Sequence, residues 1–185
     1  VTGDLNKVYY NFDVSFPTYT VEATDPYAEA AGANGDRGMV VDMSATDPTG
    51  WEYDVSPNKG MNYTDAIIYE MHVREFTIDS SSGVDAAYRG KYLGLTQSGT
   101  NYKGYSTGLE HLKELGITHV QLMPVFDFNS VDEYHLTDWA QYAWGYDPKN
   151  YSCVEGGYAT DPFDGTTRIT EFKQMVQTFH SNGIN

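Results

Sequence analysis

Residues 107–125, TGLEHLKELGITHVQLMPV, join the pattern of an amphipathic helix to that of a buried strand. Three leucines recur at helical spacing, and Thr107 with Glu110 has the form of a capping box at the start of that helix. Gly116 stands where helices commonly end, and 117–125 is a nearly continuous apolar run. The segment therefore predicts a helix followed by a strand that is covered on both faces.

Similar elements are predicted before and after this segment. Residues 66–76, AIIYEMHVREF, form a β-prone run that is typical of a strand buried on both faces. Apolar residues at helical spacing over 169–179 predict a second helix that ends at Gly183, where Asn-Gly-Ile (182–184) should begin a further strand. This order of elements is typical of a parallel sheet. Because so short an open sheet would leave apolar faces and unpaired edges, we expect the chain to be a fragment of a larger α/β protein.

The first residues carry a different pattern. Residues 7–16, KVYYNFDVSF, alternate apolar and polar side chains, which predicts an antiparallel strand with one face in water. Pro17 interrupts the alternation and residues 19–23 resume it, as in a hairpin. Since a lone hairpin is not a stable domain, we expect these strands to be the remnant of an antiparallel β-sandwich. Residues 24–64 are rich in turn signals and predict a long surface connector with an apolar anchor at 39–41.

The composition limits the classes of function. The chain has 26 acidic and 11 basic side chains, and its formal net charge of −15 argues against nucleic acid and anionic membranes as partners. No apolar run approaches the roughly 18 residues of a spanning helix, so we expect no membrane insertion. The single cysteine, Cys153, cannot form an internal disulfide, and we expect it to be a small buried filler. This composition suits a secreted or cell-surface protein and a cytoplasmic one alike.

The aromatic content points to a class of ligand. The 16 Tyr, 8 Phe and 3 Trp suit sugar binding, because flat amphipathic rings stack on sugar faces, although core packing is the alternative for any single ring. Many of these rings lie in a long loop at 126–167, which follows the carboxyl end of a predicted strand, where α/β folds place their ligands. General phosphate-loop, zinc-hydrolase and serine-elbow motifs are missing. The segment 142–151, YAWGYDPKNY, is therefore the best candidate site.

This segment also carries a family resemblance. YAWGYDP (142–148) closely resembles YNWGYDP, the signature of type I pullulanases in the α-amylase family, glycoside hydrolase family 13. The first departure, Ala143 for Asn, removes an amide near the cleaved sugar and is compatible with a divergent debranching specificity; the second, Val154, stands where the family usually has Pro. The resemblance covers essentially the whole chain, through the segments 1–14, 25–42, 64–77, 108–128 and 155–176.

The resemblance implies a fold. Residues 1–47 are expected to be the end of a carbohydrate-binding type of β-sandwich with its connector, and 48–63 a linker. Residues 64–185 are expected to be the N-terminal part of a (β/α)8 glycoside hydrolase barrel, namely its first two β/α units. The predicted fold class is thus α/β: a partial TIM barrel preceded by the remnant of an antiparallel β-sandwich.

The resemblance implies a function as well. Type I pullulanases are retaining glycoside hydrolases that act on α-1,6 branch points, so the expected partners are α-glucans: pullulan, amylopectin, glycogen and maltooligosaccharides. Retaining hydrolysis uses two carboxyl groups about 5–5.5 Å apart, and in this family both lie beyond residue 185. We therefore expect no catalytic residue in this chain, no activity of the chain alone, and the missing C-terminal part of the enzyme as a partner. The alternatives are a non-catalytic α-glucan-binding module and one half of a nicked enzyme.

Three residues are implied as substrate-binding. Tyr146 would stack on the sugar whose bond is cleaved, Asp147 would hydrogen-bond around it, and Trp144 would support the loop from beneath. From burial habits alone, Trp144 is more often a buried anchor than a ligand contact, and Asp147 before Pro148 could simply form an Asx turn. His72, like Arg74, is interpreted as a satisfied polar group of the barrel interior.

One acidic segment could bind a metal ion. Its oxygen ligands could hold a structural calcium ion, although no cofactor is expected to be required. Their spacing matches no known calcium loop, so we favour a solvated acidic surface. The residues concerned are Asp127, Asp132, Glu133, His135 and Asp138.

Overall fold

The computed structural model describes residues 2–137 and 141–185, which divide into two compact units. The first unit contains the chain up to Thr46 together with Pro124–Gly157 and Asp161–Ile169. The second contains Asp47–Met123, Tyr158–Thr160 and Thr170–Asn185. No helix in the described ranges is long and apolar enough to cross a membrane.

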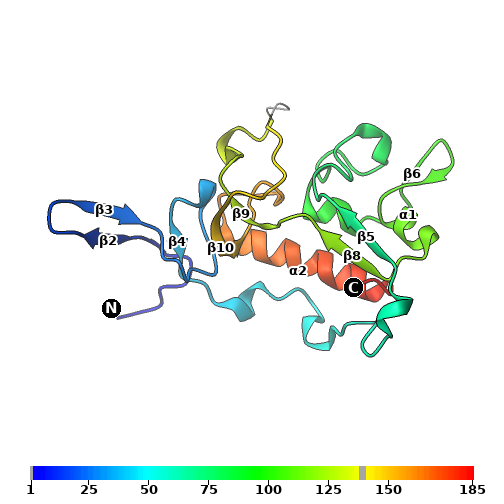
Figure 1. Ribbon diagram of the computed structural model, residues 1–185, viewed down its shortest axis with the longest axis horizontal. Helices are drawn as coiled ribbons and strands as arrows, with labels where there is room; N and C mark the ends of the chain where they lie inside the picture. The colour runs from blue at the N-terminus through cyan, green and yellow to red at the C-terminus, as the bar shows by residue number, and fades with distance from the viewer. Residues whose placement is uncertain (1, 138–140) are drawn as a thin grey trace. The chain divides into compact units, whose positions relative to one another are not determined.

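The first unit is built from short antiparallel pairs (Figure 1). These pairs are β1 (Tyr9–Tyr10) with β4 (Gly38–Met39), β2 (Phe12–Ser15) with β3 (Thr20–Ala23), and β9 (Phe126–Phe128) with β10 (Pro148–Val154). The hairpin expected around Pro17 is confirmed, since Phe12 pairs with Ala23 and Ser15 with Thr20. The predicted strand over 7–16 is interrupted at Asn11, so β1 and β2 pair with different partners.

Small residues fill the core of the first unit. One buried cluster joins Ala28 and Ala31 to Cys153, whose thiol lies 3.1 Å from the carbonyl oxygen of Ala28. A second cluster contains Ala30, Met39 and Ile169. The predictions of a buried filler at Cys153 and of an apolar anchor around Met39 are therefore confirmed, although Val40 beside it is exposed.

The second unit contains a parallel strand pair that is connected through a helix (Figure 1). Strand β5 (Ile68–Met71) pairs in parallel with β8 (His119–Leu122), and α1 (Gly108–Leu115) lies between them in sequence. Asn185 exchanges backbone hydrogen bonds with Thr118 and Val120, as a third parallel strand would. The predicted strand–helix–strand order and the turn into extended chain after Gly183 are both confirmed.

The predicted extent and coverage of the first parallel strand are wrong. Strand β5 spans four residues, whereas a continuous strand was expected over 66–76. Ile67 and Ile68 are 52% and 62% exposed, so the strand is not covered on both faces. From His72 onward the chain turns, and the amide of Phe76 donates to the carbonyl of His72 at 3.1 Å. A run of β-prone residues fixed the location of the strand and overstated its length.

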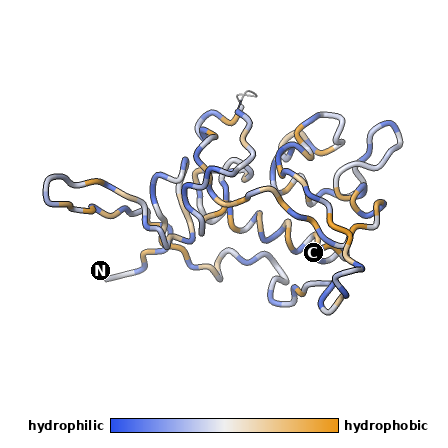
Figure 2. Tube along the Cα trace, in the orientation of Figure 1, coloured by the Kyte–Doolittle hydropathy of each residue, from blue (hydrophilic) through white to orange (hydrophobic). Residues whose placement is uncertain are grey.

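Both helices end as predicted. Gly116 takes the left-handed conformation with φ 68° and caps α1 through a bond from its amide to Lys113. The capping box is wrong, because the Thr107 hydroxyl donates to the Ser82 carbonyl at 2.5 Å and Glu110 accepts from the amide of Gly99 at 3.1 Å. Along α2 (Gly165–Ser181) hydrophobic and hydrophilic positions alternate, as Figure 2 shows.

The remaining elements are short. The hairpin of β6 (Asn101–Tyr102) and β7 (Tyr105–Ser106) precedes α1. The 3₁₀ turns are η1 (Ala33–Gly35), η2 (Met43–Thr46), η3 (Trp51–Tyr53), η4 (Tyr63–Asp65), η5 (Ser80–Ser82), η6 (Tyr92–Thr96) and η7 (Glu133–His135).

Candidate functional site

The candidate segment lies on the loop that joins β9 to β10. Phe128 pairs with Pro148 at the base of this loop, and the amide of Asn129 donates to the carbonyl of Asp147 at 3.1 Å. Because these bonds fix both ends of the loop, Tyr146 stands one residue from a hydrogen-bonded base.

Side chains along 142–146 alternate between exposed and buried. Tyr142, Trp144 and Tyr146 are 46%, 59% and 63% exposed, whereas Ala143 is 8% exposed. The two small residues, Ala143 and Gly145, are therefore buried, and the three rings are exposed. Trp144 is therefore not the buried anchor that burial habits favour, and its support of the loop stays a prediction. The Trp144 ring is exposed, as the Tyr146 ring is.

Gly145 allows this alternation. Its φ is +85°, and an added Cβ would lie 3.0 Å from the carbonyl oxygen of Pro124. Both the left-handed backbone and this close approach require glycine. The glycine thus sets the direction in which Trp144 and Tyr146 leave the loop.

Asp147 forms two hydrogen bonds within the loop. Its carboxylate accepts a hydrogen bond from the hydroxyl of Ser130, and its carbonyl closes the base with Asn129. The Asx turn predicted as an alternative is not among the hydrogen bonds of the described residues. One carboxylate oxygen is engaged by Ser130, and the half-buried side chain retains further acceptor capacity.

A second group of functional side chains surrounds Arg168, which is 1% exposed. Its Nη2 donates to a carboxylate oxygen of Glu133 at 2.5 Å, and its Nη1 donates to Asp127 at 3.3 Å. The other donated hydrogen bonds end on backbone carbonyl oxygens of Gly32, Val154 and Pro162. The guanidinium therefore joins two carboxylates and three chain segments of the first unit.

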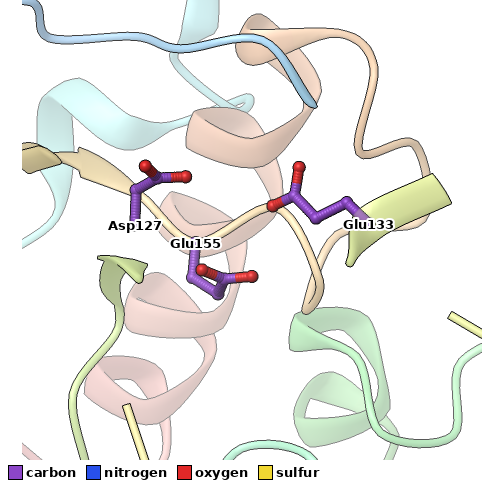
Figure 3. A group of neighbouring side chains, drawn as sticks. All are labelled: Asp127, Glu133 and Glu155. Carbon is purple, nitrogen blue, oxygen red and sulfur yellow. The ribbon is translucent and has the colours of Figure 1, made fainter. Parts of the chain in front are cut away.

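Glu155 completes the cluster around this guanidinium. The carboxylate oxygens of Asp127, Glu133 and Glu155 lie within 4.8 Å of one another, and their side chains converge in Figure 3. Glu155 accepts from the amides of Phe128 at 3.1 Å and Gly157 at 2.7 Å. It thereby ties the end of β9 to the segment that follows β10.

The charges of the cluster do not balance when every carboxyl is ionised. Burial raises the pKa of Asp127 to about 6 despite the opposing charge of Arg168. Burial, followed by the charge of Glu133, raises the pKa of Glu155 well above its usual value. One guanidinium thus faces three carboxyl groups, two of which have a raised pKa.

The expected solvated acidic surface is wrong for two residues. Asp127 is 0% and Glu133 is 4% exposed, and Arg168 supplies the buried counter-charge that pairs with both. Asp132 instead accepts from Asn34 and His135, and these two hydrogen bonds lower its pKa to about 2. The five residues of the possible calcium site are therefore not one ligand set, and Asp138 lies outside the described residues.

Sequence reasoning overlooked Glu155 and Arg168. The signal for Arg168 was its position on α2, four residues before Phe172 and seven before Met175, which places it on the apolar face of that helix. A charged residue on an apolar face needs a buried partner. No comparable pattern marks Glu155, whose partners come from distant parts of the sequence.

The polar residues after β5 are satisfied by protein partners. Nδ1 of His72 accepts from the amide of Glu75 at 3.2 Å, and its Nε2 lies 3.1 Å from the hydroxyl of Tyr158. Arg74 pairs with the carboxylate of Glu75. The prediction that His72 and Arg74 have polar partners is confirmed, while their place in a barrel interior stays a prediction.

Comparison with known proteins gives a consistent similarity. No protein-family model matches the chain. It is 42% identical to the pullulanase of Bacillus subtilis strain 168, over 100% of this chain and 24% of that protein, and 32% identical to the pullulanase of Klebsiella pneumoniae, over 99% and 23%.

Solved structures give the same result. The pullulanase from Bacillus acidopullulyticus matches with a TM-score of 0.92 and 48% identity, over 100% of this chain and 22% of that chain. The pullulanase from Anoxybacillus sp. LM18-11 complexed with maltotetraose matches with a TM-score of 0.91 and 44% identity, over 100% and 26%. The chain is therefore similar, in sequence and in fold, to pullulanases along its whole length, and it spans about a quarter of the length of these relatives.

Proposed function

We propose that this chain is a segment of a pullulanase-like hydrolase that cleaves α-1,6 bonds of α-glucans, and that it carries part of the substrate platform. The observation that carries the proposal is the exposed Tyr146 on a loop with a fixed base, within a chain similar throughout to pullulanases. The relative from Anoxybacillus was solved with maltotetraose, which supports α-glucans as ligands.

The proposed fold follows the same comparison. Strands β5 and β8 with α1 and α2 are the first two β/α units of a (β/α)8 barrel within residues 64–185. Residues 1–47 are the end of a β-sandwich with its connector, and 48–63 link the two. The parallel pairing of β5 with β8 and the backbone bonds of Asn185 support this assignment.

In the proposed chemistry this chain binds the substrate, and residues outside 1–185 carry out the catalysis. The ring of Tyr146 stacks on the sugar at the cleaved bond, its neighbour Trp144 extends the same exposed aromatic surface, and Asp147 accepts from sugar hydroxyls. The catalytic nucleophile and acid lie outside residues 1–185. The three carboxyl groups around Arg168 are not this pair, because they are buried and bonded to protein groups that a sugar would have to displace.

A titration with maltotetraose, followed by NMR of the 185-residue chain, tests the platform. Tyr146→Ala should weaken binding at least about fivefold, since a stacked ring contributes about 1 kcal/mol beyond its buried area. Tyr27→Ala is the matched control, because Tyr27 is 86% exposed and lies in the same unit. Equal affinity of both variants and the unmodified chain would contradict the role of Tyr146.

Pullulan hydrolysis separates the proposed enzyme from the other two interpretations. The chain alone should release no reducing sugar from pullulan, whereas the protein that contains it with its remaining barrel should. A containing protein that binds maltotetraose without hydrolysing any branched glucan would instead be a glucan-binding module. A species that is larger than this chain in native mass measurements, and that separates on denaturation into this chain and a second polypeptide, would identify a nicked enzyme.

A further inference from the structure

A pocket in the first unit lies apart from the residues proposed above. Its volume is about 380 Å³, at the lower end of the range of roughly 300–1,000 Å³ that small-molecule sites occupy. It is lined by three aromatic rings, those of Tyr9, Tyr134 and Phe163, and by the charged pair Asp36 and Arg37. None of the residues proposed to contact the cleaved sugar lines it.

The rings offer apolar faces at the surface. Tyr134 and Phe163 are 59% and 51% exposed, and their centroids lie 5.3 Å apart at a tilt of 56°. The hydroxyl of Tyr9 donates to the carbonyl of Phe163 at 2.7 Å, which fixes one ring against the segment that carries another. Exposed rings held in this way offer stacking surface at low entropic cost.

The floor of the pocket permits a close approach of Tyr9. An added Cβ at Gly32 would lie 2.9 Å from a ring carbon of Tyr9, so glycine lets the ring lie against the backbone. The carbonyl of Gly32 accepts from Arg168 at 2.9 Å, which anchors this floor to the buried cluster. Both contacts hold the pocket in one arrangement.

The charged pair adds a donor and an acceptor. Asp36 is held by Lys149 at 2.5 Å and keeps further acceptor capacity, being exposed at the rim. Arg37 has no side-chain hydrogen bond or ion pair within the described part of the chain, so its donors are available. A carboxylate and a guanidinium that line the same pocket match hydroxyl groups, which both donate and accept. The net charge of −15 disfavours an anionic ligand.

We infer that this pocket is a second contact site for an α-glucan, in which Tyr134 and Phe163 stack on glucose units while Asp36 and Arg37 bind their hydroxyls. The choice of α-glucan among sugars rests on the proposed function. A polymer chain held at two places binds more tightly than at either, because the second contact forms at high effective concentration. The pocket would therefore favour long glucans over short ones.

The test is a titration of the 185-residue chain with maltotetraose, read from the backbone amides by NMR. Two groups of signals should shift independently, one that includes Ala33 and Tyr134 and one that includes Gly145 and Asp147. The double variant R37A/Y134A should weaken the first group at least tenfold and leave the second unchanged. Y146A should weaken the second group at least about fivefold and leave the first unchanged, and Y27A should alter neither.

The two proposals fail in different ways. Shifts confined to the Gly145 group, with no effect of R37A/Y134A, overturn the pocket and leave the proposed platform standing. Shifts confined to the Ala33 group, with no effect of Y146A, overturn the role of Tyr146 and leave the pocket standing. No saturable shift in a chain with dispersed amide signals overturns both. Equal affinity of the unmodified chain and R37A/Y134A for amylopectin would also contradict the pocket.

Discussion

Replacement of Arg168 by methionine should destabilise the first unit strongly. Methionine fills a similar volume and removes the buried positive charge that pairs with Asp127 and Glu133. Removal of one partner from a buried ion pair costs about 3–5 kcal/mol, because the remaining charge is left uncompensated. At roughly 2–4 °C per kcal/mol for a chain of this length, the melting temperature should fall by roughly 6–20 °C.

The assay is urea unfolding of the unmodified chain and the variant at several pH values. Without the guanidinium the buried carboxyl groups should take up protons more readily in the folded state. The penalty of the substitution should therefore shrink as the pH falls toward 4. Arg37→Met is the matched control, since Arg37 is exposed and its guanidinium has no partner in the residues described, and it should change stability by less than about 0.5 kcal/mol.

A triple variant isolates the cause. R168M combined with D127N and E133Q removes the guanidinium together with the two carboxylates that pair with it, and it should recover at least half of the lost stability. A loss below about 1 kcal/mol for R168M, or a penalty that does not change with pH, would refute the argument that an uncompensated charge is responsible. A triple variant as unstable as the single one would assign the loss to packing.

Three further perturbations test separate parts of the structure. The folded pKa of Asp127, about 6, lies above its unfolded value of 3.8, so stability that is present near pH 4 should be lost as the pH rises through 6. In urea unfolding, the unmodified chain should lose up to about 3 kcal/mol relative to Asp127→Asn between pH 4 and 7. A difference between the two proteins that does not change with pH would contradict this. Gly145→Ala should lower stability by about 1–3 kcal/mol, and by more than Gly60→Ala does. Gly60 is the control because its φ is +86° but no atom lies within 4 Å of the added Cβ. Equal losses of the two variants in thermal melts would exclude crowding against Pro124 as the cause. Burial raises the pKa of Cys153 to about 12, so a thiol reagent at pH 8 should label it only as fast as the unit opens, and labelling at the rate of a free thiol would contradict its burial.

Local patterns predicted the elements of this fold well. The spacing of apolar residues located α1 and α2, and Gly116 marked a helix end that the structure places at the same residue. Among the predictions that were wrong are those for residues whose hydrogen-bond partners lie far away in the sequence. Thr107 has the sequence of a capping residue, yet the carbonyl of Ser82, twenty-five residues away, receives its hydroxyl instead. Tertiary competition of this kind leaves no trace in a short window of sequence.

In the candidate site, too, the local motif singled out residues but did not predict which of them are exposed. Tyr146 and Asp147 were located from a local motif and from their place after a predicted strand. Trp144 lies exposed between Ala143 and Gly145, two small residues that take the buried positions along the loop. Burial statistics for tryptophan could not anticipate this, because they describe a residue type rather than its place in an alternating segment.

The Arg168 cluster connects two separate surfaces of the first unit by hydrogen bonds. Through Gly32 the guanidinium fixes the floor of the aromatic pocket, and through Asp127 it holds the strand at the base of the Tyr146 loop. Glu155 bonds the next residue of that strand, Phe128. A buried ion cluster is a costly way to gain stability, but its directional bonds fix geometry. The position of Tyr146 relative to the pocket thus depends on charges that neither surface exposes.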